Sequence, residues 1–399
     1  MTNPKPLGNA HLLVIVLAQF AGTSLWFAGN AILPNLQTLL GTTTALNGWI
    51  TSAVQLGFIA GTLVYTLLRI PDTYPASRVF LVSVLAAALF NLLILALPLR
   101  PGWVLLSRFG TGFFLAGVYP VGMKIAADWF RPVLGRAMGF LVGALVLGTA
   151  LPHLIRGLGT SLPYQGVLLT VSTVAVLGGL LLAWVIPATP VVRRPGTFSL
   201  RVIPNLLQPG PLRTGVLGYF GHMWELYALW AFLPALLAIY GKQHPDFLFN
   251  PSIWAFWGIA AGFVGCAGGG LLALRLGSNR VAISNLIISG CCTALIPIAV
   301  YAPPLLFLAF LILYGIAIAG DSPQLTTIIS ANVPNEVRGS LLTLVTCIGF
   351  SITIISIQTL AWLLPYLGGS AWAFWVLVPG PILGVWGLTR NQGFRSNAS

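Results

Sequence analysis

Apolar residues occur in long blocks along this chain, separated by Pro, Gly or charged residues. A helix that crosses the hydrocarbon core of a bilayer needs about 20 such residues, and twelve blocks approach or exceed that length. They fall near 11–33, 46–68, 78–98, 102–126, 136–158, 164–187, 214–240, 252–274, 280–301, 304–330, 339–364 and 371–389. The pattern predicts an all-α membrane protein with twelve transmembrane helices. Because this number is even, both chain ends are expected on one side of the membrane.

Charge content excludes the soluble classes. Only 6% of the 399 residues are charged and 57% are hydrophobic, whereas soluble domains are about a quarter charged. The net charge of +13 does not indicate nucleic acid, because the basic residues stand singly or in pairs between apolar blocks. The expected surroundings are therefore the lipid bilayer. The four cysteines lack metal-ligand or C-x-x-C spacing, so neither a metal nor a cofactor is expected.

The basic residues also predict the orientation of the chain. With a cytoplasmic N-terminus, fifteen of the 19 Lys and Arg residues fall in cytoplasmic segments, and only Arg100, Arg156 and Lys242 fall outside. Basic residues concentrate on the cytoplasmic side of membrane proteins. We therefore expect a multi-pass protein of the inner (plasma) membrane with both termini in the cytoplasm.

The chain divides into two similar halves. The longest cytoplasmic gap, 188–212, is rich in Pro and Arg and reads as a linker between an N-terminal bundle, 1–187, and a C-terminal bundle, 213–399. Sequence features recur at an almost constant offset: Leu-Pro pairs at Pro34 and Pro234, and arginines at Arg78 and Arg280. Duplicated six-helix units are a known transporter plan, with the solute site between them near the bilayer midplane.

At this point the chain resembles the major facilitator superfamily over nearly its whole length. The loop after the eighth block is similar to that family's motif G-x8-G-x3-D-R-x-G-x-x-R at Gly262, Gly270, Arg275, Gly277 and Arg280, with seven residues between the first two glycines and Leu274 at the acidic position. The fourth block carries a similar Arg-Gly motif at Arg108 and Gly112. Two phrases, 119–124 and 320–324, resemble bacterial members near the cyanate/nitrate-permease-like branch.

The resemblance implies a fold of two pseudo-symmetric six-helix bundles that work by alternating access, in a protein expected to be monomeric. It also implies gating roles for residues of the cytoplasmic loops. These residues are Gly270, Arg275, Gly277, Arg280, Arg136 and Arg338.

Few ionisable residues lie within the apolar blocks, and each costs a few kcal/mol or more at bilayer depth. The main candidates are Arg108 in block four, His222 and Glu225 in block seven, and Asp321 in block ten. In the superfamily the first, fourth, seventh and tenth helices line the central cavity. The first block adds Trp26 and Asn30 to the expected solute site.

Each candidate has a functional and a structural interpretation. Glu225 and His222, three residues apart on one helix, would exchange a coupling proton, or Glu225 would be neutralised by an arginine for packing alone. Asp321, just before Pro323, would carry a proton or solute, or would cap a new helical segment. Arg108 would clamp an anion, pair with Glu225 or Asp321, or hold the helices in register.

Trp224 and Tyr227 flank Glu225. Their rings would line the binding site of a ligand, or would only pack against neighbouring helices. These residues favour a secondary transporter of a small solute, with a proton as coupling ion and a small anion or organic acid as the favoured solute. The alternative is proton-coupled efflux of lipophilic cations. An intramembrane enzyme is disfavoured because neither G-x-S-x-G nor H-E-x-x-H occurs.

Overall fold

The computed structural model describes residues 8–42, 45–130, 134–159, 162–187, 206, 208, 210–333 and 337–390, and every regular element in them is a helix. The helices of the first half are α1 (Asn9–Thr23), α2 (Ala28–Ala31), α3 (Leu33–Leu40), α4 (Ala45–Leu67), α5 (Ile70–Thr73), α6 (Ala76–Ala96), α7 (Pro101–Leu115), α8 (Tyr119–Trp129), α9 (Leu134–Leu158) and α10 (Tyr164–Val185). Those of the second half are α12 (Pro211–Gln243), α13 (Pro251–Ala260), α14 (Gly262–Leu276), α15 (Ser278–Ala299), α16 (Pro304–Gly320), α17 (Ser322–Ala331), α18 (Arg338–Tyr366), the 3-10 helix η3 (Ala371–Leu377) and α19 (Pro379–Thr389).

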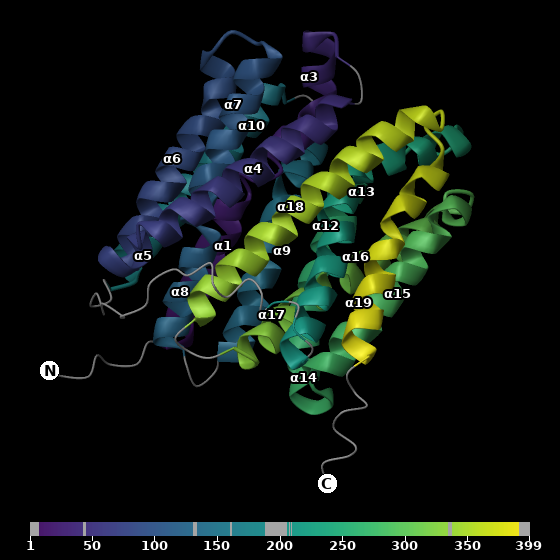
Figure 1. The fold of residues 1–399 in the computed structure, drawn as a ribbon. Helices are drawn as coiled ribbons and strands as arrows, with labels where there is room; N and C mark the ends of the chain where they lie inside the picture. The colour runs from purple at the N-terminus through teal and green to yellow at the C-terminus, as the bar shows by residue number, and fades with distance from the viewer. Residues whose placement is uncertain are drawn as a thin grey trace, which may run out of the picture.

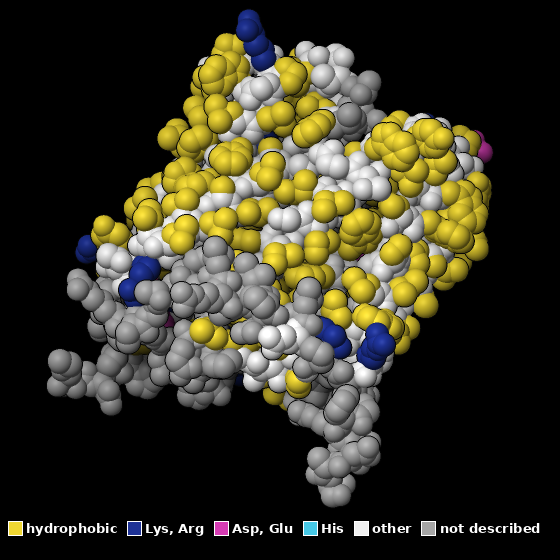
Figure 2. Space-filling view, viewed as in Figure 1, with side chains coloured by type: hydrophobic (Ala, Val, Ile, Leu, Met, Phe, Trp, Pro, Cys, Tyr) yellow, Lys and Arg dark blue, Asp and Glu magenta, His cyan; other side chains and the backbone are white. Residues whose placement is uncertain are grey.

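Within the described residues, 11 helices are long and apolar enough to cross a membrane, and the shorter apolar helix α1 is continued by α2 and α3. Figure 1 shows α3 at one end of the molecule and α8, α14 and α17 at the other. On the face seen in Figure 2, hydrophobic side chains cover the broad middle, and the visible Lys and Arg side chains lie toward its margins. This is the distribution expected of a surface that meets lipid hydrocarbon in its middle and water at its ends.

The helices pack as two bundles joined along two seams. In the first half α4 packs on α7, α6 on α7 and α10, and α1 on α9 and α10; in the second, α12 packs on α18 and α19, and α14 and α15 pack on α16. The seams between the halves are α4 against α18, and α9 against α13 and α14. The twelve-span arrangement in two bundles confirms the predicted fold class. The predicted linker falls on residues that, apart from 206, 208 and 210–212, lie outside the described ones.

Each seam holds a hydrogen bond, and the two bonds lie at opposite ends of the bundle. Thr66 at the end of α4 lies 3.3 Å from Thr343 near the start of α18, hydroxyl to hydroxyl. At the far end of the other seam, the amide of Asn250 donates to the carbonyl oxygen of Gly157 over 2.9 Å. The two halves therefore touch at both ends of the bundle, through one seam at each end.

Several spans are broken, and most breaks have a local cause. Pro120, Pro323 and Pro379 each lie at the first or second position of the helix that follows a break, where the missing N–H and fixed φ are tolerated. The break in the first span, from Ser24 to Phe27, has no proline. Irregular backbone at membrane depth persists only where the protein satisfies the freed polar groups, so this break needs a partner from elsewhere.

Candidate functional site

Arg108 supplies that partner. Its side chain is fully buried on α7, and Nη2 donates to the carbonyl oxygens of Leu25 at 2.8 Å and Trp26 at 2.7 Å. Nη1 donates to Oδ1 of Asn91 on α6 at 2.7 Å. The Asn91 amide in turn donates to Ser172 on α10 at 3.0 Å. The guanidinium thus ties four spans of the first half together at the break.

No carboxylate among the described residues is within ion-pair distance of Arg108. The sequence allowed a pair with Glu225 or Asp321, but the structure instead compensates the guanidinium charge with carbonyl and amide oxygens. Its Nε has no hydrogen-bond partner and lies close to Gly29. Nη1 already donates to Asn91, and Nη2 donates to two carbonyl oxygens. A solute anion would have to displace these acceptors to form a two-point contact with the guanidinium.

Glu225 has a different set of partners from those expected. It lies on α12 and is buried, and Ser289 of α15 donates to its Oε2 at 3.0 Å. Thr293 of α15 and Tyr314 of α16, the latter at 2.9 Å, donate to its Oε1. Three hydroxyl donors satisfy most of the acceptor capacity of the carboxylate. Glu225 therefore belongs to a hydroxyl network inside the C-terminal bundle.

Replacing Glu225 by Gln is expected to destabilise the protein by about 1–3 kcal/mol. The Gln amide brings two N–H donors to a site built from O–H donors, so at least one hydroxyl loses its acceptor. Thermal unfolding in detergent measures the effect. Asp246→Asn, at an exposed acid, is the control and is expected to change stability by less than about 0.5 kcal/mol. Equal stability of Glu225→Gln and the unmodified protein would contradict the network.

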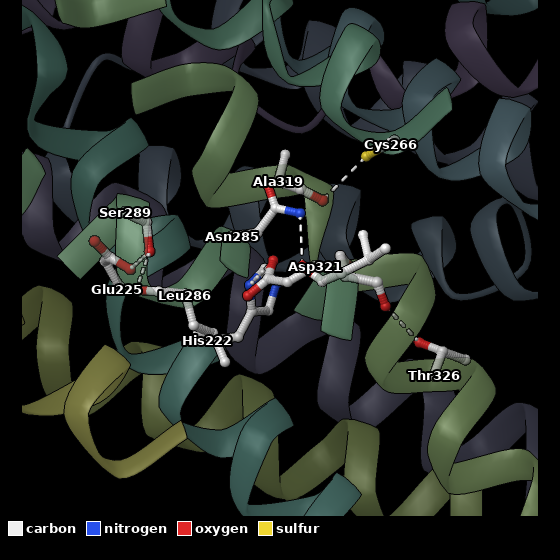
Figure 3. Close-up of polar contacts among 11 residues, drawn as sticks. His222, Glu225, Cys266, Asn285, Leu286, Ser289, Ala319, Asp321 and Thr326 are labelled. Atoms are coloured by element: carbon white, nitrogen blue, oxygen red, sulfur yellow. Dashed lines mark hydrogen bonds and ion pairs between the residues drawn. The ribbon is translucent and has the colours of Figure 1, made fainter. Parts of the chain in front are cut away.

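His222 pairs with Asp321. His222 Nδ1 lies 2.8 Å from Asp321 Oδ1, and both side chains are 1% exposed. Asp321 stands at the break between α16 and α17 and is the N-cap residue of α17, yet its side chain makes no capping hydrogen bond. His222 Nε2 has no hydrogen-bond partner, and among the described side chains only His222 pairs with the Asp321 carboxylate, near which the backbone N–H groups of Asp321 and Ser322 also lie. Figure 3 shows the two side chains lying against each other, with Glu225 directed toward Ser289.

The structure thus separates the two candidate groups on α12. Residues at i and i+3 of a helix differ by about 60° in direction, and here that angle decides which neighbouring helix each one meets. His222 meets the break before α17, and Glu225 meets α15 and α16. The site therefore contains one ionisable pair, His222 with Asp321, and one separate carboxylate, that of Glu225.

An aromatic layer fills the space between the halves. Its members are all buried: Trp26, Phe27, Phe58, Tyr227, Trp230 and Phe350. Rings from the two halves stack directly, with centroids 5.8 Å apart for Trp26 and Tyr227 and 5.6 Å for Trp26 and Phe350. The predicted site residues Trp26 and Tyr227 therefore meet in this layer. Trp224 does not, because its Nε1 donates to the carbonyl oxygen of Val376 on η3 at 2.8 Å.

Asn30, four residues after Trp26 of the aromatic layer, bonds to α4. Its amide donates to Asn47 Oδ1 at 3.1 Å and Thr51 Oγ1 at 2.8 Å, both on α4. The Asn47 amide crosses to the other half and donates to the carbonyl oxygen of Ala231 on α12 at 2.9 Å. The candidate Asn30 is therefore part of a polar contact between the bundles.

The loop-motif residues lie apart from the buried groups. Gly270 approaches Gly139 of α9 in the second seam. Arg275 lies in the last turn of α14 and Arg280 in the first turn of α15, and both are exposed. Between them Gly277 has φ 81°, a value that residues with a Cβ rarely adopt. The motif here forms a tight exposed turn.

The remaining loop arginines make local contacts. Arg136 Nη2 donates to Asn9 Oδ1 at 3.1 Å, and Arg338 Nη2 to the carbonyl oxygen of Val333 at 3.2 Å. In the first half Lys124 lies 3.4 Å from Asp128, as the i,i+4 spacing predicts, and also 3.2 Å from Asp72 in α5. Whether these loops gate transport stays a prediction.

Comparison with known families decides the assignment. The model of the Major Facilitator Superfamily matches residues 15–357. The chain belongs to the major facilitator superfamily. It is therefore a multi-pass membrane transporter and not an enzyme, as predicted. Among curated protein sequences none matches significantly, and the finer branch near cyanate/nitrate permeases stays a prediction.

Solved structures show the same fold for this superfamily member. The human organic anion transporter MFSD10 (TETRAN) is 16% identical with a TM-score of 0.70, over 97% of this chain and 100% of that one. A point mutant of the nucleoside transporter NupG is 14% identical with a TM-score of 0.72, over 98% of this chain and 100% of that one. At these identities the likeness extends to the fold alone.

Several residues of the site escaped the sequence analysis. Asn91, Ser289, Thr293 and Tyr314 are single neutral residues in apolar blocks, and such residues carry little signal by themselves. One signal was available. Asn91 and Thr293 lie 202 positions apart, within the offset that relates the two halves, and each bonds the central charge of its own bundle.

Proposed function

We propose that this protein is a proton-coupled secondary transporter in which the two bundles rock about a solute held between them. The proposal keeps both termini in the cytoplasm of an inner-membrane protein. The contacts between the halves at both ends of the bundle support it, because they are the contacts that must break and re-form when the two bundles rock. The small solute and the lipid bilayer are the expected partners of the protein, which we take to act as a monomer.

The observation that carries the proposal is the His222–Asp321 pair. A carboxyl and an imidazole at 2.8 Å, both buried and with Nε2 of the imidazole free, form a site that takes up one proton without a large rearrangement. The pair lies where α16 breaks, and broken helices are typical of ion sites in transporters. We assign proton coupling to His222 and Asp321, and a structural role to Glu225.

The structure constrains the charge of the solute less than it constrains the coupling of transport to protons. Anion binding by Arg108, favoured by the sequence, loses support because its Nη groups hold Asn91 and two carbonyl oxygens. Lipophilic cation efflux has the acids Glu225 and Asp321 in its favour, but Glu225 accepts from three hydroxyls and Asp321 is paired with a potentially cationic imidazole. Organic anions and nucleosides, named for the two structural neighbours, both belong in a test.

Proteoliposomes that contain a trapped pH dye test the function. Organic acids, organic cations, nucleosides and nucleobases are added in turn, with and without an imposed proton gradient. At least one solute is expected to move protons with it and to accumulate against its own gradient when the outside is acid. Solute movement that ignores both the gradient and an uncoupler would contradict coupling and leave a uniporter.

A further inference from the structure

We propose that the solute is an uncharged, planar heteroaromatic molecule that carries both hydrogen-bond donors and acceptors. Its binding site would be the aromatic layer between the bundles, and Gln55 would be its main polar contact. This inference rests on the proposed function only in taking the region between the bundles as the solute path.

The ring contacts define the place. Phe58 lies 4.8 Å from Trp26 and 4.6 Å from Phe350, centroid to centroid, and Tyr227 lies 5.5 Å from Trp230. The layer therefore draws rings from α4, α12, α18 and the break in the first span. When the bundles move apart, these faces separate, and a flat ring is the shape that restores stacking on both sides.

Polar atoms without partners occur in this layer and on the helices that form it. Trp26 Nε1 and Trp230 Nε1 are buried donors with no acceptor, and Asn30 Oδ1 is a buried acceptor with no donor. Gln55 is fully buried, and neither its Oε1 nor its Nε2 has a partner. Buried groups of this kind are rare because each one left unpaired costs stability. Two of these residues belong to the layer and two lie on α2 and α4 beside it in the chain, and together they indicate a ligand that supplies the missing bonds.

The position of Gln55 places its side chain on the inner face of α4. It follows Thr51, which bonds Asn30, by four residues and precedes Phe58 of the aromatic layer by three. Residues at this spacing share one face of a helix. Thr62, seven residues after Gln55, is also buried with an unpartnered hydroxyl. The face of α4 toward the centre of the molecule therefore offers an amide and a hydroxyl.

The chemistry of these groups fixes the class of solute. Two indole donors and one amide, which is both donor and acceptor, match a ring with carbonyl and N–H groups. None of the six rings or Gln55 carries a charge. The buried charged groups of the two bundles have partners of their own: Arg108 donates to three acceptors, Glu225 accepts from three hydroxyls and Asp321 pairs with His222. A charged solute would lose its hydration at this layer without gaining a counter-charge.

Thermal shift of the purified protein with a matched set of probes tests this. Nicotinamide and uracil are the neutral probes, nicotinate and orotate are their carboxylates, and nicotinamide methylated on its ring nitrogen is the cation. We expect the neutral probes to raise the melting temperature in a saturable way and the charged ones to leave it unchanged. Tighter binding of a charged member, or no binding by either neutral probe, would overturn the proposal.

Gln55→Leu is the variant that ties binding to the layer. Because Leu removes an unpartnered buried amide, the variant is expected to be at least as stable as the unmodified protein, while its half-saturation for the neutral probes rises about tenfold or more. Gln358→Leu is the matched control, since that glutamine already donates to Ser52 at 2.9 Å on the same seam. It is expected to lower stability and keep the response to the probes. Unchanged binding in Gln55→Leu would refute the site.

The two proposals fail separately. Neutral probes that bind and need Gln55, but move no protons in proteoliposomes, would contradict coupling and leave the solute class intact. Proton-coupled transport of an anion or cation would support coupling and contradict the proposed solute class.

Discussion

Asp321→Asn is expected to abolish proton-driven accumulation while solute exchange continues. Asn keeps the size of Asp and can still accept a hydrogen bond from His222 Nδ1, now 2.8 Å from Oδ1, so the helix break and the packing are retained. It cannot take up a proton. Uphill transport driven by an acid outside should fall to the level of empty liposomes, whereas exchange of labelled for unlabelled solute across the membrane should persist. Both are measured in the same proteoliposomes.

Asp246→Asn is the control for this experiment. Asp246 is an exposed acid in the loop between α12 and α13, far along the chain from the breaks, and its loss should change neither measurement. Persistent uphill transport in Asp321→Asn would remove Asp321 from coupling. Loss of exchange together with accumulation, in a variant of normal stability, would assign Asp321 to solute binding instead.

The spans could be predicted from the sequence because lipid imposes the length of each apolar block. The blocks near 78–98 and 164–187 correspond to Ala76–Ala96 and Tyr164–Val185. The break at Asp321 was also predictable, because Pro323 cannot continue a helix. The break from Ser24 to Phe27 was not. It depends on Arg108 of another span, which bonds backbone carbonyls, and every residue has a carbonyl.

The same limit applies to the candidate site. Buried charge drew attention to Arg108, His222, Glu225 and Asp321, and the structure buries all four. Their partners could not be predicted, because the rotation of α12 decides that His222 meets Asp321 while Glu225 meets Tyr314. A spacing along one helix says which residues share a side, but not which neighbouring helix each one contacts.

Arg108→Met is expected to give the largest loss of stability of any substitution considered. Met keeps much of the side-chain volume but leaves the carbonyl oxygens of Leu25 and Trp26 and Oδ1 of Asn91 without a donor. At about 1 kcal/mol or more for each unpaired buried acceptor, the cost is about 3 kcal/mol. Thermal unfolding in detergent and the yield of folded protein measure it. Arg100→Met, at an exposed arginine that precedes α7, is the control and should be close to neutral.

Arg108→Lys separates the structural role from a solute role. An ammonium carries three donors on one atom, whereas the acceptors here are reached by two separate nitrogens, so Lys should recover only part of the lost stability. A structural role requires that transport in this variant, measured per folded molecule, retains the solute preference of the unmodified protein. If Arg108→Lys is instead as stable as the unmodified protein and selectively loses an anionic solute, then the guanidinium contacts the solute, and the break in the first span is held by other groups.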